Sequence, residues 1–386
     1  MPSLSACRPR SDGYHPFAVN RIATIVGARP QFVKAAVVSR ALREHGIDEL
    51  IIHTGQHSEA LMSTIFFDEL GIPAPSSNLG VSGGGHGEQT GAMMAALERE
   101  LRGLGPPVDA VLVYGDTNST LAGALVGAKL RMPVIHVEAG LRSWNRRMPE
   151  ELNRVVVDHV STVLLCPTEG AVANLAGEGI VHGGRPQRDV RLVGDVMLDA
   201  ARAFSDRAER ALAGSELGSL PIGAYLLVTI HRAENTDDPT RLATITEALR
   251  LIAREMPVVW PVHPRIRQSL PTVGLMMGDD ASGIRLIEPV GYLGMLALER
   301  RAKCILTDSG GVQKEAYFAG VPCVTVRDET EWVELVEAGW NRVVPPTAAE
   351  PLVEAVRTAR PGRDCFAPYG DGDASARIAR IVAGCR

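Results

Sequence analysis

The stretch Cys304-Ile305-Leu306-Thr307-Asp308-Ser309-Gly310-Gly311-Val312-Gln313-Lys314-Glu315-Ala316 decides the fold that this sequence predicts. Its apolar start is typical of the end of a buried strand, and the residues after the two glycines have helix-compatible spacing. Glycine lets the backbone approach a ligand closely, and a helix start offers unpaired N–H groups and the positive end of its dipole. With the Ser309 hydroxyl, this turn suits a phosphate or diphosphate. Glu315, one turn into the helix, could reach a ribose diol.

A purely structural interpretation of the same turn stays open. Asp308 or Ser309 would cap the helix equally well if no ligand were bound there. A ligand site also needs a second half, so the remaining strand ends decide between the two interpretations.

Size and composition limit the classes of protein to which the chain can belong. The 386 residues, 45% of them hydrophobic, are enough for two α/β domains. The net charge of −5 is spread without long runs, which argues against nucleic acid or an anionic membrane as partner. No apolar stretch approaches the roughly 20 residues that span a bilayer, and the first residues do not resemble a signal peptide. We expect a soluble, cytoplasmic protein whose six scattered cysteines are buried thiols and not a zinc site.

The first half of the chain begins like a Rossmann-like βαβ unit. The apolar run 22–26 predicts a strand, Gly27 begins a turn, and a helix follows. The dinucleotide fingerprint G-x-G-x-x-G is absent. Arg29 and Lys34 stand near the helix start instead, where cations can face an anionic ligand, although exposed helix-surface charges are the alternative.

Three further strands in this half end in polar residues. The runs 50–53, 110–114 and 134–137 are followed by residues that include His57, Asp116 and Glu138. Since parallel α/β sheets place ligands at the carboxyl ends of their strands, we expect these side chains and Arg29 on one rim. A single acid there would often be only a helix cap. Residues 83–90 read as a mobile glycine loop, either a lid or a connector, and Glu150 and Glu151 open a helix, for which dipole capping is a sufficient reason.

The second half repeats the design. Residues 190–195 are interpreted as the link, and new strands over 225–230 and 258–262 end at His231 and His263. A lone histidine there would more often be structural, but two of them beside a diphosphate turn favour ligand binding. We predict an N-terminal Rossmann-like domain over 20–190, a second one over 191–366 that binds the diphosphate, and a C-terminal helix in 367–386 that packs back towards the first.

Two Rossmann-like domains facing across a cleft describe the GT-B architecture, and the chain resembles one family with that fold, the non-hydrolysing UDP-N-acetylglucosamine 2-epimerases. The resemblance spans roughly residues 22–382 and rests on an ordered set of motifs. These are Gly27-Ala28-Arg29-Pro30, Thr54-Gly55-Gln56-His57, Gly115-Asp116-Thr117-Asn118-Ser119, His136-Val137-Glu138-Ala139-Gly140-Leu141-Arg142, Met148-Pro149-Glu150-Glu151-Leu152-Asn153-Arg154, His231-Arg232-Ala233-Glu234-Asn235, Thr307-Asp308-Ser309-Gly310-Gly311-Val312-Gln313 and Pro368-Tyr369-Gly370-Asp371-Gly372.

The resemblance implies inversion at C2 of the sugar, with UDP-GlcNAc and UDP-ManNAc interconverted for cell-surface polysaccharide. UDP is eliminated as the C2 proton leaves, a glycal forms, and UDP is re-added with protonation on the other face. No nicotinamide, other cofactor or metal is implied. The family is typically dimeric, so a homodimer is expected.

Roles also follow from the resemblance. Asp116, Glu138 and Glu150 are the acid/base candidates, with the face on which each acts left open, and His231 completes the catalytic set while binding the diphosphate with Arg29. The other implied substrate-binding residues are Lys34, Gln56, His57, Arg142, His263, Tyr292, Ser309, Gly310, Gly311 and Glu315.

The chain departs from the commonest family pattern in ways that bear on the substrate. Trp332 stands where an arginine is usual, a variant similar to the branch that acts on UDP-2,3-diacetamido-glucuronate. Glu59 stands where some members use glutamine to bind an activating second UDP-GlcNAc, which leaves allosteric activation open. Beside the main hypothesis and that rival, a hydrolysing epimerase, a GT-B glycosyltransferase and a non-catalytic nucleotide-sugar-binding regulator remain alternatives.

Overall fold

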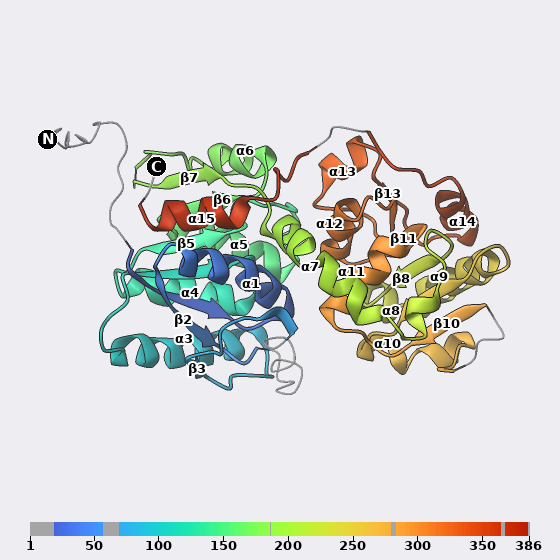
Figure 1. The fold of residues 1–386 in the computed structure, drawn as a ribbon, viewed down its shortest axis with the longest axis horizontal. Coiled ribbons are helices and arrows are strands. Elements are labelled where there is room, and N and C mark those ends of the chain that lie inside the picture. Colours follow the sequence, from blue (N-terminus) through green and yellow to red (C-terminus); the bar gives the residue numbers. More distant parts are fainter. Residues whose placement is uncertain (1–18, 57–68, 186, 279–282, 364–366, 385–386) are drawn as a thin grey trace, which may run out of the picture.

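The fold consists of two parallel sheets, each between layers of helices. The computed structural model describes residues 19–56, 69–185, 187–278, 283–363 and 367–384 (Figure 1). The parts built on the two sheets, here called the first and second domain, face one another, with helix α7 between them (Figure 1). This is the GT-B arrangement of two Rossmann-like domains, and the predicted fold class is confirmed.

The first sheet has seven strands in the order β3-β2-β1-β4-β5-β6-β7, all parallel. Its strands are β1 (Arg21–Val26), β2 (Asp48–His53), β3 (Ser77–Asn78), β4 (Ala110–Tyr114), β5 (Val134–Val137), β6 (Val163–Cys166) and β7 (Asp189–Leu192). β4 and β5 are buried throughout, as continuous apolar runs in a sheet covered on both faces should be.

The second sheet has six parallel strands in the order β10-β9-β8-β11-β12-β13. Its strands are β8 (Leu226–Thr229), β9 (Val258–Pro261), β10 (Ile284–Ile287), β11 (Cys304–Thr307), β12 (Cys323–Thr325) and β13 (Asn341–Val343). In each sheet the strand order reverses beside the domain's first strand, between β1 and β4 and between β8 and β11. Ligands of open α/β sheets bind at such reversals, beyond the carboxyl ends of the strands.

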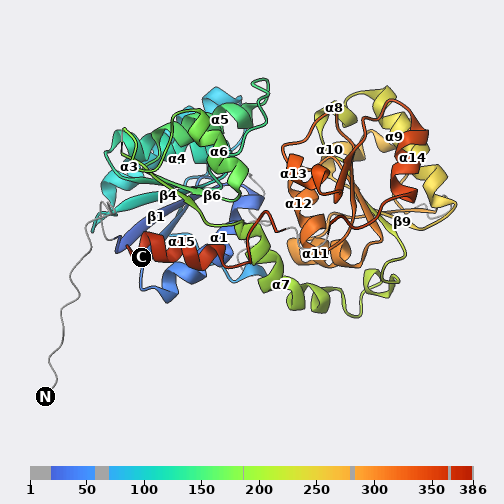
Figure 2. The same cartoon turned by 90° about the horizontal axis from the view of Figure 1, so that it is seen from above.

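Helices cover both faces of each sheet. In the first domain they are α1 (Arg29–Glu44), α3 (His86–Gly103), α4 (Asn118–Lys129), α5 (Pro149–Val160), α6 (Glu169–Gly177) and α15 (Ala374–Val382). The connecting helix is α7 (Val196–Leu212), and the second domain has α8 (Ala233–Thr236), α9 (Pro239–Ala253), α10 (Pro264–Arg267), α11 (Tyr292–Arg301), α12 (Gly310–Phe318), α13 (Val333–Glu337) and α14 (Ala349–Arg357), with short 3₁₀ turns at Leu217–Ser219 and Leu270–Val273. Figure 2 shows α1 and α15 on one face of the first sheet, with α3, α4 and α5 on the other.

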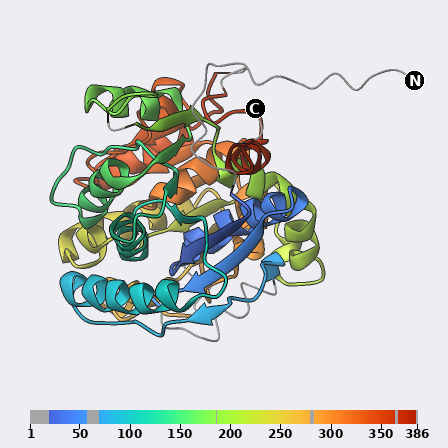
Figure 3. The same ribbon diagram turned by 90° about the vertical axis from the view of Figure 1, so that its left-hand side faces the viewer.

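The C-terminal helix returns to the first domain. α15 packs against α1 and α7, and Figure 3 shows it end-on in dark red near the blue α1. Asp199 of α7 fixes its start, because its carboxylate accepts from the Ser375 N–H at 2.6 Å and from the Ala374 N–H at 3.2 Å. Helix α7 also packs on α11 and α12, so one buried apolar cluster runs from Ile22 of β1 through Phe204 to Ile305 of β11.

Two local expectations differ from the structure. Residues 190–195 were expected to be a linker, but 190–192 belong to β7 of the first sheet, and the crossing to the second domain comes between β7 and α7. The expected glycine loop over 83–90 is shorter, because α3 begins at His86. β7 was not recognised as a strand because Arg191 interrupts its apolar residues. Among the described residues it is an edge strand that pairs only with β6.

Candidate active site

Glu138 lies at the centre of a charge cluster beyond the carboxyl end of β5. One carboxylate oxygen accepts from Lys34 of α1, and the other accepts from Lys314 of α12 at 2.9 Å. Lys314 also donates to Asp195, the residue that precedes α7, at 2.6 Å. Two lysines and two carboxylates from both domains therefore meet in one buried cluster.

The backbone at Glu138 is held in a conformation that only a few residues other than glycine adopt. Its φ is 69°, and its N–H donates to Leu165 of β6. Such strain persists where the surroundings impose it, and it is concentrated at functional sites. Gly115, after β4, leaves the needed room, since a Cβ there would lie 3.1 Å from the Glu138 carboxylate and 3.3 Å from Lys34 Nζ.

The two lysines keep Glu138 ionised. Burial alone would raise the pKa of its carboxyl group, but Lys314 and Lys34 outweigh burial and lower that pKa well below its ordinary value. Burial opposes the charge on Lys314 in the same way, and Asp195 and Glu138 reverse the effect and raise the pKa of Lys314. The cluster is thus a set of mutually stabilised ions.

Asp116, beside Gly115, belongs to a second ion-pair network on the same rim. Its carboxylate pairs with Arg154 of α5, whose other amino group donates to Glu151 at 3.0 Å. Glu151, 2% exposed, also accepts from the Ser143 N–H at 2.9 Å and so fixes the loop before α5. Glu150 lies partly exposed in the first turn of α5, and no described residue forms a hydrogen bond or ion pair with its carboxylate.

Gln56 fastens the end of β2 to the start of α4. Its amide oxygen accepts from the Ser119 hydroxyl at 2.6 Å and from the Ser119 N–H at 3.0 Å. Gly27, after β1, lies against the same two segments, the end of β2 and the start of α4. A Cβ there would overlap the hydroxyls of Thr54 and Ser119. His57 lies outside the described residues.

The rim of the second domain is organised by Asp308, which is fully buried after β11. Its carboxylate accepts from the His231 N–H at 3.0 Å and from the Arg232 N–H at 2.9 Å, and so joins the two strand ends at the reversal. His231 Nδ1 lies 3.3 Å from the same carboxylate, and its ring is 5.3 Å from the ring of His263. Desolvation lowers the pKa of His231, with Asp308 acting against it, so the imidazole is neutral near pH 7.

The predicted diphosphate turn begins α12. Ser309 is the residue before the helix, and its side chain caps no N–H, so the alternative of a plain serine cap does not describe this turn. The Gly310 carbonyl accepts from the Trp332 indole N–H at 2.8 Å, and a Cβ on Gly310 would overlap Glu331. Gly311 is exposed, and the nearest atom to a Cβ there is 4.0 Å away.

Glu315 has a different electrostatic environment from Glu138. Its carboxyl shares a hydrogen bond with that of Glu299, which is 1% exposed. Desolvation raises the pKa of Glu315 to about 7, while Lys314 and Arg29 act to lower it. The attraction to Arg29 places the start of α1 close to this residue across the two domains.

Two predicted binding residues have side chains committed elsewhere. The Arg142 side chain is 0% exposed and pairs with Asp158 at 2.7 Å and with Glu178 at 2.7 Å. Tyr292 is buried at the start of α11, where its ring packs edge-on against Phe204 of α7 with 6.1 Å between centroids. Arg142 is thus held by carboxylates of the first domain, whereas Tyr292 stays near the predicted residue Glu315, whose charge acts together with burial to raise the pKa of the tyrosine.

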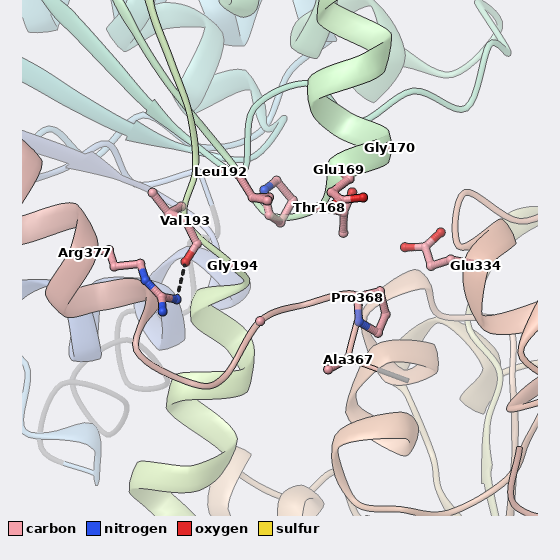
Figure 4. Close-up of a pocket in the computed structure, with 12 residues that line it drawn as sticks. Thr168, Glu169, Gly170, Leu192, Val193, Gly194, Glu334, Ala367, Pro368 and Arg377 are labelled. Atoms are coloured by element: carbon pink, nitrogen blue, oxygen red, sulfur yellow. Dashed lines mark hydrogen bonds between the residues drawn. The ribbon is translucent and has the colours of Figure 1, made fainter. Parts of the chain in front are cut away.

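A pocket of about 620 Å³ lies beyond β6 and β7 (Figure 4), and neither Glu138 nor Asp116 lines it. Glu169 of the first domain and Glu334 of the second lie on opposite sides of it, and Arg377 donates to the Val193 carbonyl at its edge (Figure 4). The Tyr369 hydroxyl donates to Glu334 at 3.0 Å, and its ring packs against Trp332. Lys314 Nζ lies 4.3 Å from the centroid of the Trp332 ring.

Two residues of the site, Lys314 and Asp195, were not singled out from the sequence. The available signal was a lysine one residue before Glu315, within a turn expected to bind an anion. None of the helices in the described part of the chain is long and apolar enough to cross a membrane.

Known proteins resemble the chain along nearly its whole length. The family model described as UDP-N-acetylglucosamine 2-epimerase matches residues 40–383. UDP-2,3-diacetamido-2,3-dideoxy-D-glucuronate 2-epimerase of Pseudomonas aeruginosa is 50% identical over 94% of this chain and 99% of its own length. UDP-N-acetylglucosamine 2-epimerase of Methanocaldococcus jannaschii is 43% identical over 94% of this chain and 98% of its own length.

Solved structures agree. The crystal structure of the Methanocaldococcus jannaschii UDP-GlcNAc 2-epimerase in complex with UDP-GlcNAc and UDP superimposes with a TM-score of 0.83, at 41% identity, covering 94% of this chain and 99% of that one. Fold, site geometry and sequence thus lead to the same assignment. The chain belongs to the UDP-N-acetylglucosamine 2-epimerase family.

Proposed function

We propose that this chain is a non-hydrolysing UDP-N-acetylglucosamine 2-epimerase that interconverts UDP-GlcNAc and UDP-ManNAc. Removal of the C2 proton breaks the bond between C1 and the diphosphate oxygen, and UDP leaves with the electron pair. The 2-acetamidoglucal that remains then takes a proton on the opposite face of C2 as UDP adds back to C1. The family assignment supports the reaction class.

The observation that carries the proposal is the placement of Glu138. This ionised carboxylate lies beyond the carboxyl end of β5, the strand next to the reversal between β1 and β4, and it pairs with Lys314 of α12, the helix that the diphosphate turn of the second domain begins. A carboxylate positioned there can move a proton at carbon, while the cations around it offset charge as UDP departs.

The remaining roles are proposed from position. Asp116, Glu138 and Glu150 would share proton transfer at the two faces of C2, with neither face assigned to a particular residue. His231, Arg29 and the N–H groups of the Ser309–Gly311 turn would hold the diphosphate, and Glu315 would hold the ribose. Keeping UDP bound while the glycal exists makes its return to C1 an intramolecular step.

A second candidate is the epimerisation of UDP-2,3-diacetamido-2,3-dideoxy-glucuronate at C2. The relative of that name is 50% identical to this chain, and Trp332 occupies the position of the usual arginine. The chemistry at C2 would be the same, so the two candidates differ only in the sugar. We also propose a cytoplasmic homodimer that takes UDP-sugars as substrate, as the resemblance implies.

Proton NMR of the enzyme with UDP-GlcNAc in D2O tests the proposal. We expect loss of the C2 proton signal together with new UDP-ManNAc signals, and no free ManNAc. The same experiment with the 2,3-diacetamido-uronate sugar separates the two candidates by relative turnover. If both sugars keep their C2 proton and configuration, the chain is not a 2-epimerase of either, and UDP binding without turnover would favour a regulator.

A further inference from the structure

Lys314 is the one residue of α12 whose charged group enters the first domain. It is 2% exposed, and its ammonium group lies between Glu138 at 2.9 Å and Asp195 at 2.6 Å. The Trp332 ring closes a third side, with its centroid 4.3 Å from Nζ. Apart from offsetting charge as UDP departs, the proposed reaction gives this lysine no task.

A buried lysine needs a reason to be present, since removing an ammonium group from water is costly unless opposite charges surround it. Asp195 alone would be a sufficient partner. Glu138, in turn, already has a cation in Lys34 of its own domain. The additional pairing of Lys314 with Glu138 therefore exceeds what charge balance at Asp195 requires.

The second pairing acts on the proposed catalytic carboxylate. Glu138 is contacted on one oxygen by each lysine, so both oxygens are fixed in direction. Of the two attractions that lower the pKa of Glu138 against burial, that of Lys314 is the larger. Lys34 is fixed to the first domain, whereas Lys314 moves with α12 of the second.

We propose that Lys314 is a positioning residue that makes the orientation and charge of Glu138 depend on the approach of the two domains. When the domains are together, Lys314 completes the Glu138 site, and when they separate it is withdrawn. Proton removal from C2 is thereby restricted to the state in which the diphosphate turn is also in place. This inference rests on the proposed epimerase function.

If Lys314 only neutralised Asp195, the kinetic effect of removing it would be different. Asp195 caps α7 by accepting from the Met197 N–H at 2.8 Å, and it lies at the crossing between the domains. If Lys314 served only to neutralise Asp195, removing both charges together would restore whatever the loss of the lysine had damaged.

The experiment compares Lys314→Met with the double variant Lys314→Met/Asp195→Asn. Exchange of the C2 proton and epimer formation are followed in D2O, UDP binding by calorimetry, and stability by thermal melting. We expect Lys314→Met to lower kcat roughly 100-fold with KM changed less than about threefold. We expect the double variant to regain the melting temperature but not kcat. The matched control is Lys303→Met, because Lys303 is an exposed lysine directly before β11. This variant should behave as the wild type.

Turnover of Lys314→Met within about threefold of the wild type would overturn the inference, and so would recovery of kcat in the double variant. If Lys314→Met does not fold, the double variant, which leaves no unpaired carboxylate at 195, decides by its kcat alone. A wild type that leaves C2 unexchanged would defeat the proposed function instead. The inference would then be judged by small-angle X-ray scattering with UDP, where Lys314→Met must give a larger radius of gyration than the wild type, and an equal radius would overturn it.

Discussion

Glu138 and Glu315 are two carboxylates on opposite rims of the same site, and they have opposite electrostatic environments. Burial raises the pKa of both groups. At Glu138 two lysines overcome burial, and the pKa falls far below its ordinary value. At Glu315 burial outweighs the attraction of Lys314 and Arg29, and it raises the pKa to about 7. The partners, not the depth of burial, decide which carboxylate is charged.

The comparison extends to the rims as a whole. The first rim already has its charges paired, through Lys34 at Glu138 and Arg154 at Asp116. The second rim offers backbone N–H groups around Gly311 and the Glu315 carboxyl group, whose pKa burial raises to about 7. One rim is organised before the substrate arrives, and the other is completed by it.

Glu138→Gln is the variant for which we expect the largest loss of activity. The amide keeps the size of the side chain but cannot take a proton, so we expect epimerisation and C2 exchange to fall by roughly 10²- to 10⁴-fold. UDP binding, which is assigned to residues other than Glu138, should change little when measured by calorimetry. The control is Glu169→Gln, because Glu169 is an exposed carboxylate beyond the next strand, β6. A fall in both variants alike would remove the special position of Glu138.

A second test compares the glycines of the two rims. Gly27→Ala should lower the free energy of unfolding by about 1–3 kcal/mol, because the new methyl group overlaps the hydroxyls of Thr54 and Ser119. Gly311→Ala, with no atom closer than 4.0 Å to the methyl group, should leave stability unchanged or slightly higher and weaken only UDP binding. Urea denaturation of both variants measures the difference. Equal losses of stability would show that the second rim is as tightly packed as the first.

The smallest effect concerns the pH dependence of stability. The pKa of Glu315 is about 7 in the folded protein, whereas the ordinary value of 4.5 applies to the unfolded chain. Between these two pH values the folded state holds a proton that the unfolded state has released. The free energy of unfolding therefore decreases as pH rises through this window. Glu315→Gln should make that decrease shallower in urea titrations at pH 5, 6 and 7. Parallel curves for variant and wild type would contradict the raised pKa.

Much of the fold could be predicted because apolar runs are local signals. The strands β1, β4, β5 and β9 match their predicted ranges within one residue. The edge strands β3, with two residues, and β13, with three, were missed because so short a segment has no periodicity to detect. β7 was interpreted as a linker for a related reason, since its alternation is weak at the sheet edge.

The site was predictable only in its strand ends. Asp116 and His231 do follow strands at the two reversals, and Glu138 follows β5, the strand beside the first reversal. The sequence could not reveal which charge pairs with which, because each pairing joins residues far apart along the chain. Arg142 therefore was expected to bind substrate, although Asp158 holds it, and Lys314, which contacts Glu138 across the domains, passed unnoticed.

The apolar cluster that runs through α7 has a consequence for how the molecule melts. Residues of both sheets, such as Ile22 and Ile305, belong to one uninterrupted hydrophobic interior, with Phe204 between them. Neither sheet then has a complete core without α7, so heat cannot melt one half and leave the other intact. We therefore expect the two domains to unfold together in one thermal transition.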